Sequence, residues 1–181
     1  MNHRIFLLFA ALFGFVGCDR APDLPVLHTI PDFELTEASG ATFGRDDLLG
    51  RYHLVDFVFT ECPLACPTMT AQMKAFHDAF PTDRLGFVSI SVDPDNDTLE
   101  VLRAYREKLD VDADRWSFLR GDIETVRTIS EKGFLLAASN LPYGHSLRFV
   151  LVDPEGRMRG TYQSDDPEHM AELRRVLSAI A

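Results

Sequence analysis

Residues 52–67 read YHLVDFVFTECPLACP, a short apolar run that leads directly into two cysteines, Cys62 and Cys66. The run Tyr52–Thr60 is rich in β-branched and aromatic residues, which predicts a buried strand. After the cysteines, large apolar residues recur at steps of four, three and four, which predicts one buried face of a helix. Those residues are Met69, Met73, Phe76 and Phe80. Pro67 favours the first turn of this helix, so the cysteine pair lies where a strand passes into a helix N-terminus.

The same alternation continues along the chain. Leu85–Val92 predicts a second buried strand, and further helices are expected to begin near Asp97, Asp122 and Asp166. Asp97 together with Glu100 resembles a capping box for the first of these helices.

The C-terminal part combines a hairpin with a final helix. Two strand patterns, Leu147–Val152 and Arg157–Tyr162, flank the turn sequence Asp-Pro-Glu-Gly. A β-α-β-α order followed by a hairpin and a terminal helix predicts an α/β domain of the thioredoxin-like class. We therefore expect a central mixed β-sheet flanked by helices on both faces.

Composition narrows the class of protein. The 181 residues carry a net charge of −10, and 46% of them are hydrophobic. Such an acidic chain does not predict nucleic acid as a partner, because phosphate binding needs clustered Lys and Arg. Three cysteines are too few for a disulfide-built scaffold. The chain is long enough for one domain with its own core.

The N-terminus has the pattern of an export signal. A basic start precedes an apolar run of twelve residues, Ile5–Val16, shorter than the roughly 20 that a transmembrane helix needs. Phe15-Val16-Gly17-Cys18 resembles a bacterial lipobox, so residues 1–17 are interpreted as a signal peptide and Cys18 as the lipidated residue. The alternative is an uncleaved anchor.

These features predict where the protein is located. Asp19 resembles an inner-membrane retention signal, so we expect a lipoprotein of the bacterial inner (cytoplasmic) membrane that faces the periplasm. Residues 18–29, which contain Pro22 and Pro25, are interpreted as a tether, and residues 30–181 as the folded domain.

The cysteine pair indicates thiolate chemistry. Unpaired N–H groups and the dipole at a helix N-terminus lower a thiol pKa. A thiolate is the nucleophile of disulfide exchange and also a ligand for soft metals such as Cu(I). Two alternatives remain open: a plain structural disulfide, or two small core residues. The C-x-x-x-C spacing is one residue longer than that of thioredoxin-like redox enzymes.

A third ligand would let the site accept Cu(II) as well, and histidine is the usual candidate. His145 lies in a loop that immediately precedes the strand Leu147–Val152, and such a loop can approach the strand–helix junction. The other histidines are expected in the signal peptide, in the tether, or on strand and helix surfaces: His3, His28, His53, His77 and His169. Met69 and Met73 are possible thioether ligands, but their shared apolar face favours core packing.

At these residues the chain resembles the Sco/SenC family of copper-binding, thioredoxin-like proteins that assemble cytochrome oxidase. The shared motifs occur in family order over about residues 30–165. They are Thr60-x-Cys62-Pro63-x-x-Cys66-Pro67, Ser91-Val92-Asp93-Pro94 with Asp97-Thr98, Trp116-x-x-Leu119-x-Gly121, His145-Ser146, and Leu151-x-Asp153-Pro154-x-Gly156. Two features depart from the family: Gly144 stands where many members have Asp, and the segment 134–143 is shorter than usual.

The resemblance implies that Cys62, Cys66 and His145 are ligands of copper, as Cu(I) or Cu(II). It also implies a metallochaperone that receives copper from an upstream periplasmic donor. The acceptor would be the dinuclear centre of cytochrome c oxidase subunit II, or another copper acceptor. The alternative is a thiol–disulfide reductase, with Cys62 and Cys66 as the redox pair, that keeps the cysteines of that subunit reduced.

The sequence also bears on a peroxidase function and on a charged residue in a predicted strand. A peroxidase of the peroxiredoxin type is disfavoured, because its P-x-x-x-T-x-x-C pattern is missing before either cysteine. Asp56 lies inside a predicted buried strand and therefore needs a polar partner that the sequence does not identify.

Overall fold

The structure is a computed structural model that describes residues 23–62 and 66–181, with Cys66 described by its backbone alone. The predicted signal peptide, Cys18 and residues 63–65 lie outside the described residues. Within the described ranges, no helix combines the length and the apolar character needed to cross a membrane.

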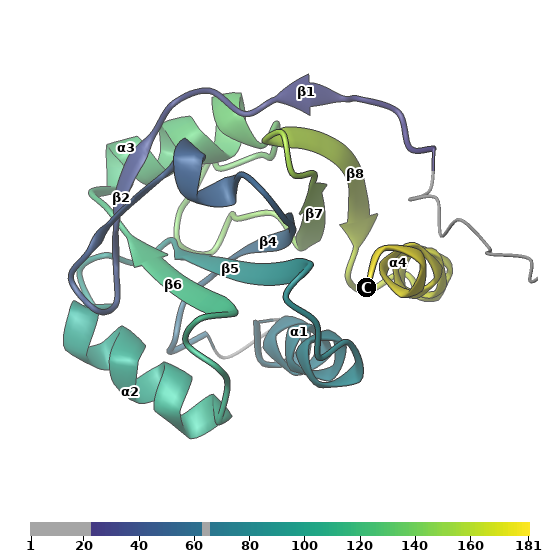
Figure 1. Cartoon of the computed structure of the whole chain (residues 1–181). Helices are drawn as coiled ribbons and strands as arrows, with labels where there is room; N and C mark the ends of the chain where they lie inside the picture. Colours follow the sequence, from purple (N-terminus) through teal and green to yellow (C-terminus); the bar gives the residue numbers. More distant parts are fainter. Residues whose placement is uncertain (1–22, 63–65) are drawn as a thin grey trace, which may run out of the picture.

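The described residues form an eight-stranded mixed sheet with the strand order β1-β8-β7-β4-β5-β6-β2-β3 (Figure 1). The strands are β1 His28–Thr29, β2 Glu34–Glu37, β3 Thr42–Gly44, β4 Tyr52–Val58, β5 Leu85–Ser91, β6 Trp116–Arg120, β7 Arg148–Val152 and β8 Arg157–Gln163. The central strands β4, β5 and β6 are parallel, and the flanking pairs are antiparallel. The predicted mixed sheet and the C-terminal hairpin are thereby confirmed.

Helices cover both faces of the sheet, as predicted. They are α1 Cys66–Ala79, α2 Leu99–Leu109, α3 Ile123–Thr128 and α4 Pro167–Ile180, with a 3-10 turn at Arg45–Leu48 and a π-helical turn at Ile129–Gly133. Helices α1, α2 and α4 lie on one face, and α3 lies on the other (Figure 1). Asp122 and Asp166 cap α3 and α4 as their sequence positions predict.

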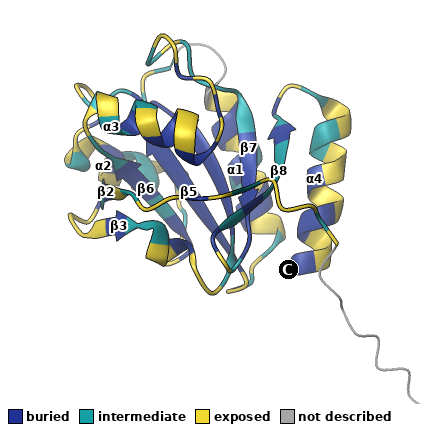
Figure 2. Cartoon of the chain, turned by 90° about the horizontal axis from the view of Figure 1, so that it is seen from above, coloured by how far each residue is buried: buried dark blue, intermediate teal, exposed yellow. Residues whose placement is uncertain are grey.

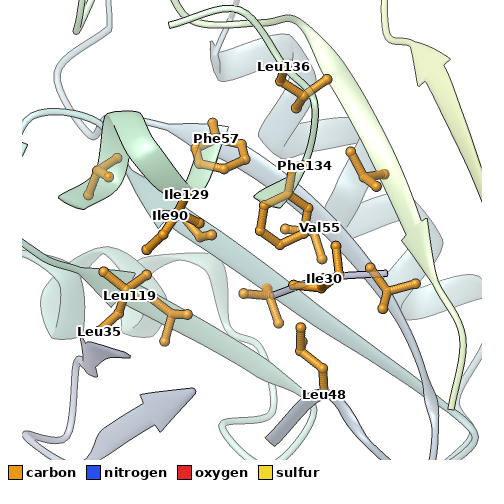
Figure 3. Packing of buried hydrophobic residues seen from close by; sticks show 14 of the residues in the cluster. Ile30, Leu35, Leu48, Val55, Phe57, Ile90, Leu119, Ile129, Phe134 and Leu136 are labelled. Atoms are coloured by element: carbon orange, nitrogen blue, oxygen red, sulfur yellow. The ribbon is translucent and has the colours of Figure 1, made fainter. Parts of the chain in front are cut away.

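Each face of the sheet has its own apolar cluster, so the central strands are buried on both sides (Figure 2). Alternate residues of β4 are divided between the clusters, since Val55 and Phe57 face α3 whereas Leu54 faces α1. On the α3 side, Phe57 packs edge-on against Phe134 with 5.5 Å between ring centroids (Figure 3). Burying a side chain of this size stabilises the fold by about 1.5–3 kcal/mol.

The parallel register brings two chain segments to one edge of the sheet. Strand β4 pairs with β5 from Tyr52↔Leu85 to Val58↔Ser91, so both strands end together. Val92 continues this pairing by donating its N–H to the carbonyl of Val58 at 2.9 Å. The segment that leads to Cys62 therefore lies beside the segment that leads to α2.

Two local expectations were wrong. Helix α2 is capped by Thr98, whose hydroxyl accepts the N–H of Val101, and not by Asp97, because the Asp97 carboxylate points inward. His53 and His77 are buried rather than exposed. Burial and the neighbouring Arg51 guanidinium lower the pKa of His53 to about 4, so this histidine is neutral at physiological pH.

The segment expected to be a tether is partly attached to the domain. The N–H of Leu27 donates to the carbonyl of Met158 at 2.8 Å, and β1 pairs with β8. His28 contacts the carbonyl of Lys132 at 3.0 Å through Nε2. Chain residues from Leu24 to Thr29 thus lie along β8.

Candidate metal centre

Cys62 lies just beyond the carboxyl end of β4. Its N–H donates to the carbonyl of Phe59 at 3.4 Å, which turns the chain as it leaves the strand. The side chain is half-buried and packs against the apolar cluster on the α3 side of the sheet. Cys66 is the first residue of α1, so the predicted strand–helix junction is confirmed for the cysteine motif. The Cys66 side chain lies outside the described residues.

His145 reaches the same place from a different part of the chain. It forms an isolated antiparallel bridge with Ala138, just ahead of β7. Its half-buried ring packs edge-on against the Phe59 ring, with 5.9 Å between centroids. Burial lowers the pKa of His145, partly offset by the Ser146 carbonyl, so the imidazole is neutral at pH 7.

The tautomer of His145 follows from its neighbour. The carbonyl of Ser146 lies 3.2 Å from Nδ1 and can only accept a hydrogen bond. This contact favours the tautomer with the proton on Nδ1, which leaves the lone pair of Nε2 for a metal ion.

Phe59 is the residue that brings the two segments together. It is buried, it accepts the N–H of Cys62, and its ring contacts His145. Tyr143 packs on Phe59 edge-on at 5.6 Å and leaves 68% of its surface exposed. Cys62 and His145 are far apart in sequence, and the structure places both of them beside Phe59.

The residues present fit a soft or borderline metal ion. A thiolate with a neutral imidazole suits Cu(I), Cu(II) or Zn(II) far better than a hard cation. Among side chains in the described part of the chain, no group of three or more Cys, His, Asp or Glu could hold a metal. The third donor expected from the sequence, Cys66, belongs to the adjacent helix terminus.

Gly144 has a packing role in the loop that presents His145. Its N–H donates to the carbonyl of Asn140 at 2.6 Å. A Cβ at position 144 would lie 2.9 Å from the Asn140 nitrogen and 3.0 Å from its carbonyl oxygen. No side chain fits there without moving the backbone of the loop.

Sequence reasoning missed one buried carboxylate near the site. Asp97 accepts hydrogen bonds from the N–H and the hydroxyl of Thr60 and from the hydroxyl of Ser91. Thr60 is only two residues from Cys62. The available signal was Asp97-Thr98 among the motifs shared with the family, whereas the capping pattern Asp97 to Glu100 predicts a role at the start of a helix.

A second buried carboxylate, Asp56, has the partner that its position requires. Ser89 donates to Asp56 Oδ1 at 2.7 Å and accepts the indole N–H of Trp116 at 3.0 Å. The other oxygen of Asp56 makes no hydrogen bond with the described residues. Burial, only partly offset by the Ser89 hydrogen bond, raises the pKa of Asp56 to about 7.

The other candidate ligands are accounted for by packing. Met69 and Met73 are buried between α1 and the sheet, so the core interpretation is confirmed. His77 packs against Phe87 and Trp116, and His169 contacts the N–H of Gln163 through Nδ1. None of these side chains is associated with Phe59.

Comparison with known proteins decides the family. The sequence profile described as SCO1/SenC matches residues 23–178, which is most of the chain. The chain belongs to the SCO1/SenC family. The thioredoxin-like fold and the family resemblance expected from the sequence are thereby confirmed.

Individual SCO1/SenC relatives agree with this assignment. One relative is a protein of Stutzerimonas stutzeri that is named as a candidate copper-binding protein. It is 30% identical to this chain, and the alignment covers 87% of this chain and 79% of the relative. A SCO1/SenC family lipoprotein from Bacillus anthracis superposes with a TM-score of 0.76 at 30% identity, covering 86% of this chain and 96% of the other. BsSco, described as having a disulfide switch and as a member of the Sco family of cytochrome c oxidase assembly proteins, has a TM-score of 0.73 at 28% identity. The match covers 86% of this chain and 95% of BsSco.

Proposed function

We propose that this SCO1/SenC protein is a copper metallochaperone that binds copper through Cys62, Cys66 and His145. The convergence of Cys62 and His145 on Phe59, next to the first residue of α1, carries the proposal. A neutral imidazole with Nε2 as acceptor and two thiolates near a helix N-terminus form a ligand set that suits copper in both oxidation states. The copper-binding name of the Stutzerimonas relative supports the choice of metal.

The copper would pass to cytochrome c oxidase subunit II, or to another copper acceptor, by ligand exchange. The family connection with cytochrome c oxidase assembly supports this acceptor. A donor on the same side of the membrane would supply the metal. Cys18 would be lipidated and would hold the protein at the outer face of the bacterial inner membrane. The lipoprotein from Bacillus anthracis supports this anchoring.

The first test is a copper titration of the full-length protein purified in detergent. We expect stoichiometric binding of Cu(I) and Cu(II), with Cu(II) giving a thiolate charge-transfer absorption. His145→Ala should remove that absorption and weaken Cu(II) binding at least tenfold, because it removes the nitrogen donor. His169→Ala is the matched control and should bind like wild type. Absence of stoichiometric copper binding by wild type would refute the metallochaperone.

A second candidate is a thiol–disulfide reductase, which the disulfide switch described for BsSco favours. One thiolate of the Cys62/Cys66 pair would attack a partner disulfide to form a mixed disulfide. The other cysteine would then release the partner as a dithiol, leaving Cys62 and Cys66 oxidised. This reaction needs both cysteines but not His145. Oxidase copper loading that survives His145→Ala and fails with Cys62→Ser would establish the reductase instead.

A further inference from the structure

Asp97 is a buried carboxylate at the point where β5 leads into α2, and only 1% of its surface is exposed. The Thr60 hydroxyl donates to Asp97 Oδ1 at 2.5 Å, and the Thr60 N–H lies 3.3 Å from both carboxylate oxygens. The Ser91 hydroxyl donates to Oδ2 at 2.5 Å. Asp97 therefore connects the end of β5 with the segment that leads from β4 to Cys62.

Asp97 is held in place by the two regular elements on either side of it, β5 and α2. The N–H of Asp97 donates to the carbonyl of Asp93 at 2.8 Å, and the next residue, Thr98, caps α2. Ser91 is the last residue of β5 and pairs with Val58. Asp97 is thus fixed to two regular elements, whereas Thr60 belongs to the short segment that follows β4.

Thr60 and Cys62 lie on the two sides of Glu61, which is exposed. The preceding residue, Phe59, packs on the His145 ring and accepts the N–H of Cys62. Any shift of Thr60 consequently moves the residue that contacts His145 and the residue that supplies the thiolate. Partners that hydrogen-bond a metal ligand directly are commonly worth about 10- to 100-fold in metal affinity. Asp97 reaches Cys62 only through Thr60, so we expect an effect at the lower end of that range.

We propose that Asp97 is a positioning residue for the metal centre, which acts through Thr60 to hold Cys62 beside Phe59 and His145. A role restricted to fold stability would affect the whole domain and would not distinguish Thr60 from Ser91. The inference rests on the proposed function, because copper binding at Cys62 is its principal consequence.

The test compares the two hydroxyls that Asp97 accepts at equal distance. Thr60→Val removes the hydroxyl on the cysteine segment, and Ser91→Ala removes the hydroxyl on β5. Asp97→Ala removes the acceptor, whereas Asp97→Asn keeps the shape and one acceptor oxygen. Asp95→Asn, an exposed position in the same loop, controls for the loss of a negative charge. All variants are made in the full-length protein.

Two measurements separate positioning from stability. Copper affinity is measured by competition with a chromophoric Cu(I) chelator, alongside the thermal midpoint of each variant. We expect Thr60→Val and Ser91→Ala to lower the midpoint by similar amounts, with Thr60→Val alone weakening copper binding about tenfold. Asp97→Ala should weaken it at least as much and Asp97→Asn less. Combining Asp97→Ala with Thr60→Val should add little, because both act through one contact.

The second measurement does not need copper. The rate at which iodoacetamide alkylates Cys62, in a Cys66→Ser background, should change with Thr60→Val and Asp97→Ala but not with Asp95→Asn. Equal losses of copper affinity for Thr60→Val and Ser91→Ala, with unchanged alkylation in every variant, would overturn the positioning role. If wild type binds no copper but alkylation still follows Thr60 and Asp97, the metallochaperone fails and the positioning of Cys62 stands.

Discussion

At the scale of single residues, Gly144 controls how the loop presents His145. Because a Cβ there would approach the Asn140 backbone to about 3 Å, Gly144→Ala should displace the loop. We expect a loss of about 1–3 kcal/mol in unfolding free energy and weaker Cu(II) binding, measured by urea denaturation and copper titration. Gly133→Ala is the matched control, since its Cβ would make only ordinary contacts of 3.7 Å or more. Unchanged copper binding in Gly144→Ala would contradict this role of the glycine.

Asp56 makes the stability of the domain depend on pH. Its pKa is raised from 3.8 to about 7 in the folded state. Between these two pH values the folded protein therefore keeps a proton on Asp56 that the unfolded chain has released. The stability that this proton provides is complete below about pH 4 and is lost as the pH rises towards 7 and above. Asp56→Asn removes the ionisation while it keeps the size of the side chain.

We therefore expect Asp56→Asn to be more stable than wild type at pH 8, by on the order of 2 kcal/mol, and similar to wild type near pH 4. The measurement is the unfolding free energy in urea at several pH values. The comparison with wild type isolates Asp56, because all other groups titrate in both proteins. A stability difference that is the same at pH 4 and pH 8 would be inconsistent with a raised pKa.

At the scale of elements, the N-terminus of helix α2 shows that tertiary contacts decide which of several candidate residues caps a helix. Asp97, Thr98 and Glu100 all match capping patterns. Thr98 caps the helix, because the Asp97 carboxylate is buried and accepts hydrogen bonds from Thr60 and Ser91. Thr98→Ala should lower the unfolding free energy by about 1 kcal/mol, measured in urea. Glu100→Ala, which removes the side-chain acceptor that a capping box needs, should have little effect, and a loss as large as that of Thr98→Ala would indicate that a capping box forms.

The sequence predicted some strands better than others, depending on their length and on whether both of their faces are buried. Strands β4 and β5 are recognisable because both of their faces are buried, which gives continuous apolar runs. Strands β1, β2 and β3 are two to four residues long. Strand β1 pairs with β8 and β2 with β6, which are distant in sequence, whereas β2 and β3 pair with each other. Such short strands carry no local periodicity, so they were missed.

The same reasoning applies to the candidate metal centre. The position of Cys62 and Cys66 at a strand–helix junction is local and was predicted correctly. The meeting of His145 with Phe59, and of Asp97 with Thr60, depends on which strands are neighbours in the sheet. A sequence pattern does not contain that information, and for His145 the family resemblance supplied the expectation.

At the scale of the whole molecule, the attachment of the N-terminal segment changes how far the domain could reach. A tether of residues 18–29 would extend about 40 Å at most, at roughly 3.5 Å per residue. The structure holds the chain to the domain from Leu24 onward, because Arg159 donates to the carbonyls of Leu24 and Pro25 at 3.1 and 3.2 Å. With Cys18 lipidated as proposed, the free span would be closer to 20 Å.

Arg159 and Arg157 provide a matched pair for testing this attachment. Both guanidinium groups bond the buried carboxylate of Asp153, Arg157 through Nε at 2.8 Å and Arg159 through Nη1 at 2.7 Å. Only Arg159 also bonds Leu24 and Pro25. Arg159→Met and Arg157→Met should therefore both lower the unfolding free energy, since each removes one charge partner from Asp153.

The two variants should differ in the N-terminal segment alone. We expect Arg159→Met to accelerate amide hydrogen exchange in the peptide that spans residues 24–30, where Leu27 donates to Met158, while Arg157→Met leaves that exchange at the wild-type rate. Local opening of this kind is detected by exchange without unfolding of the core. Equal acceleration in both variants would mean that the segment follows the stability of β8 and that Arg159 has no separate role in shortening the span. Acceleration in Arg159→Met alone would mean that a single side chain sets the distance between the domain and its proposed anchor.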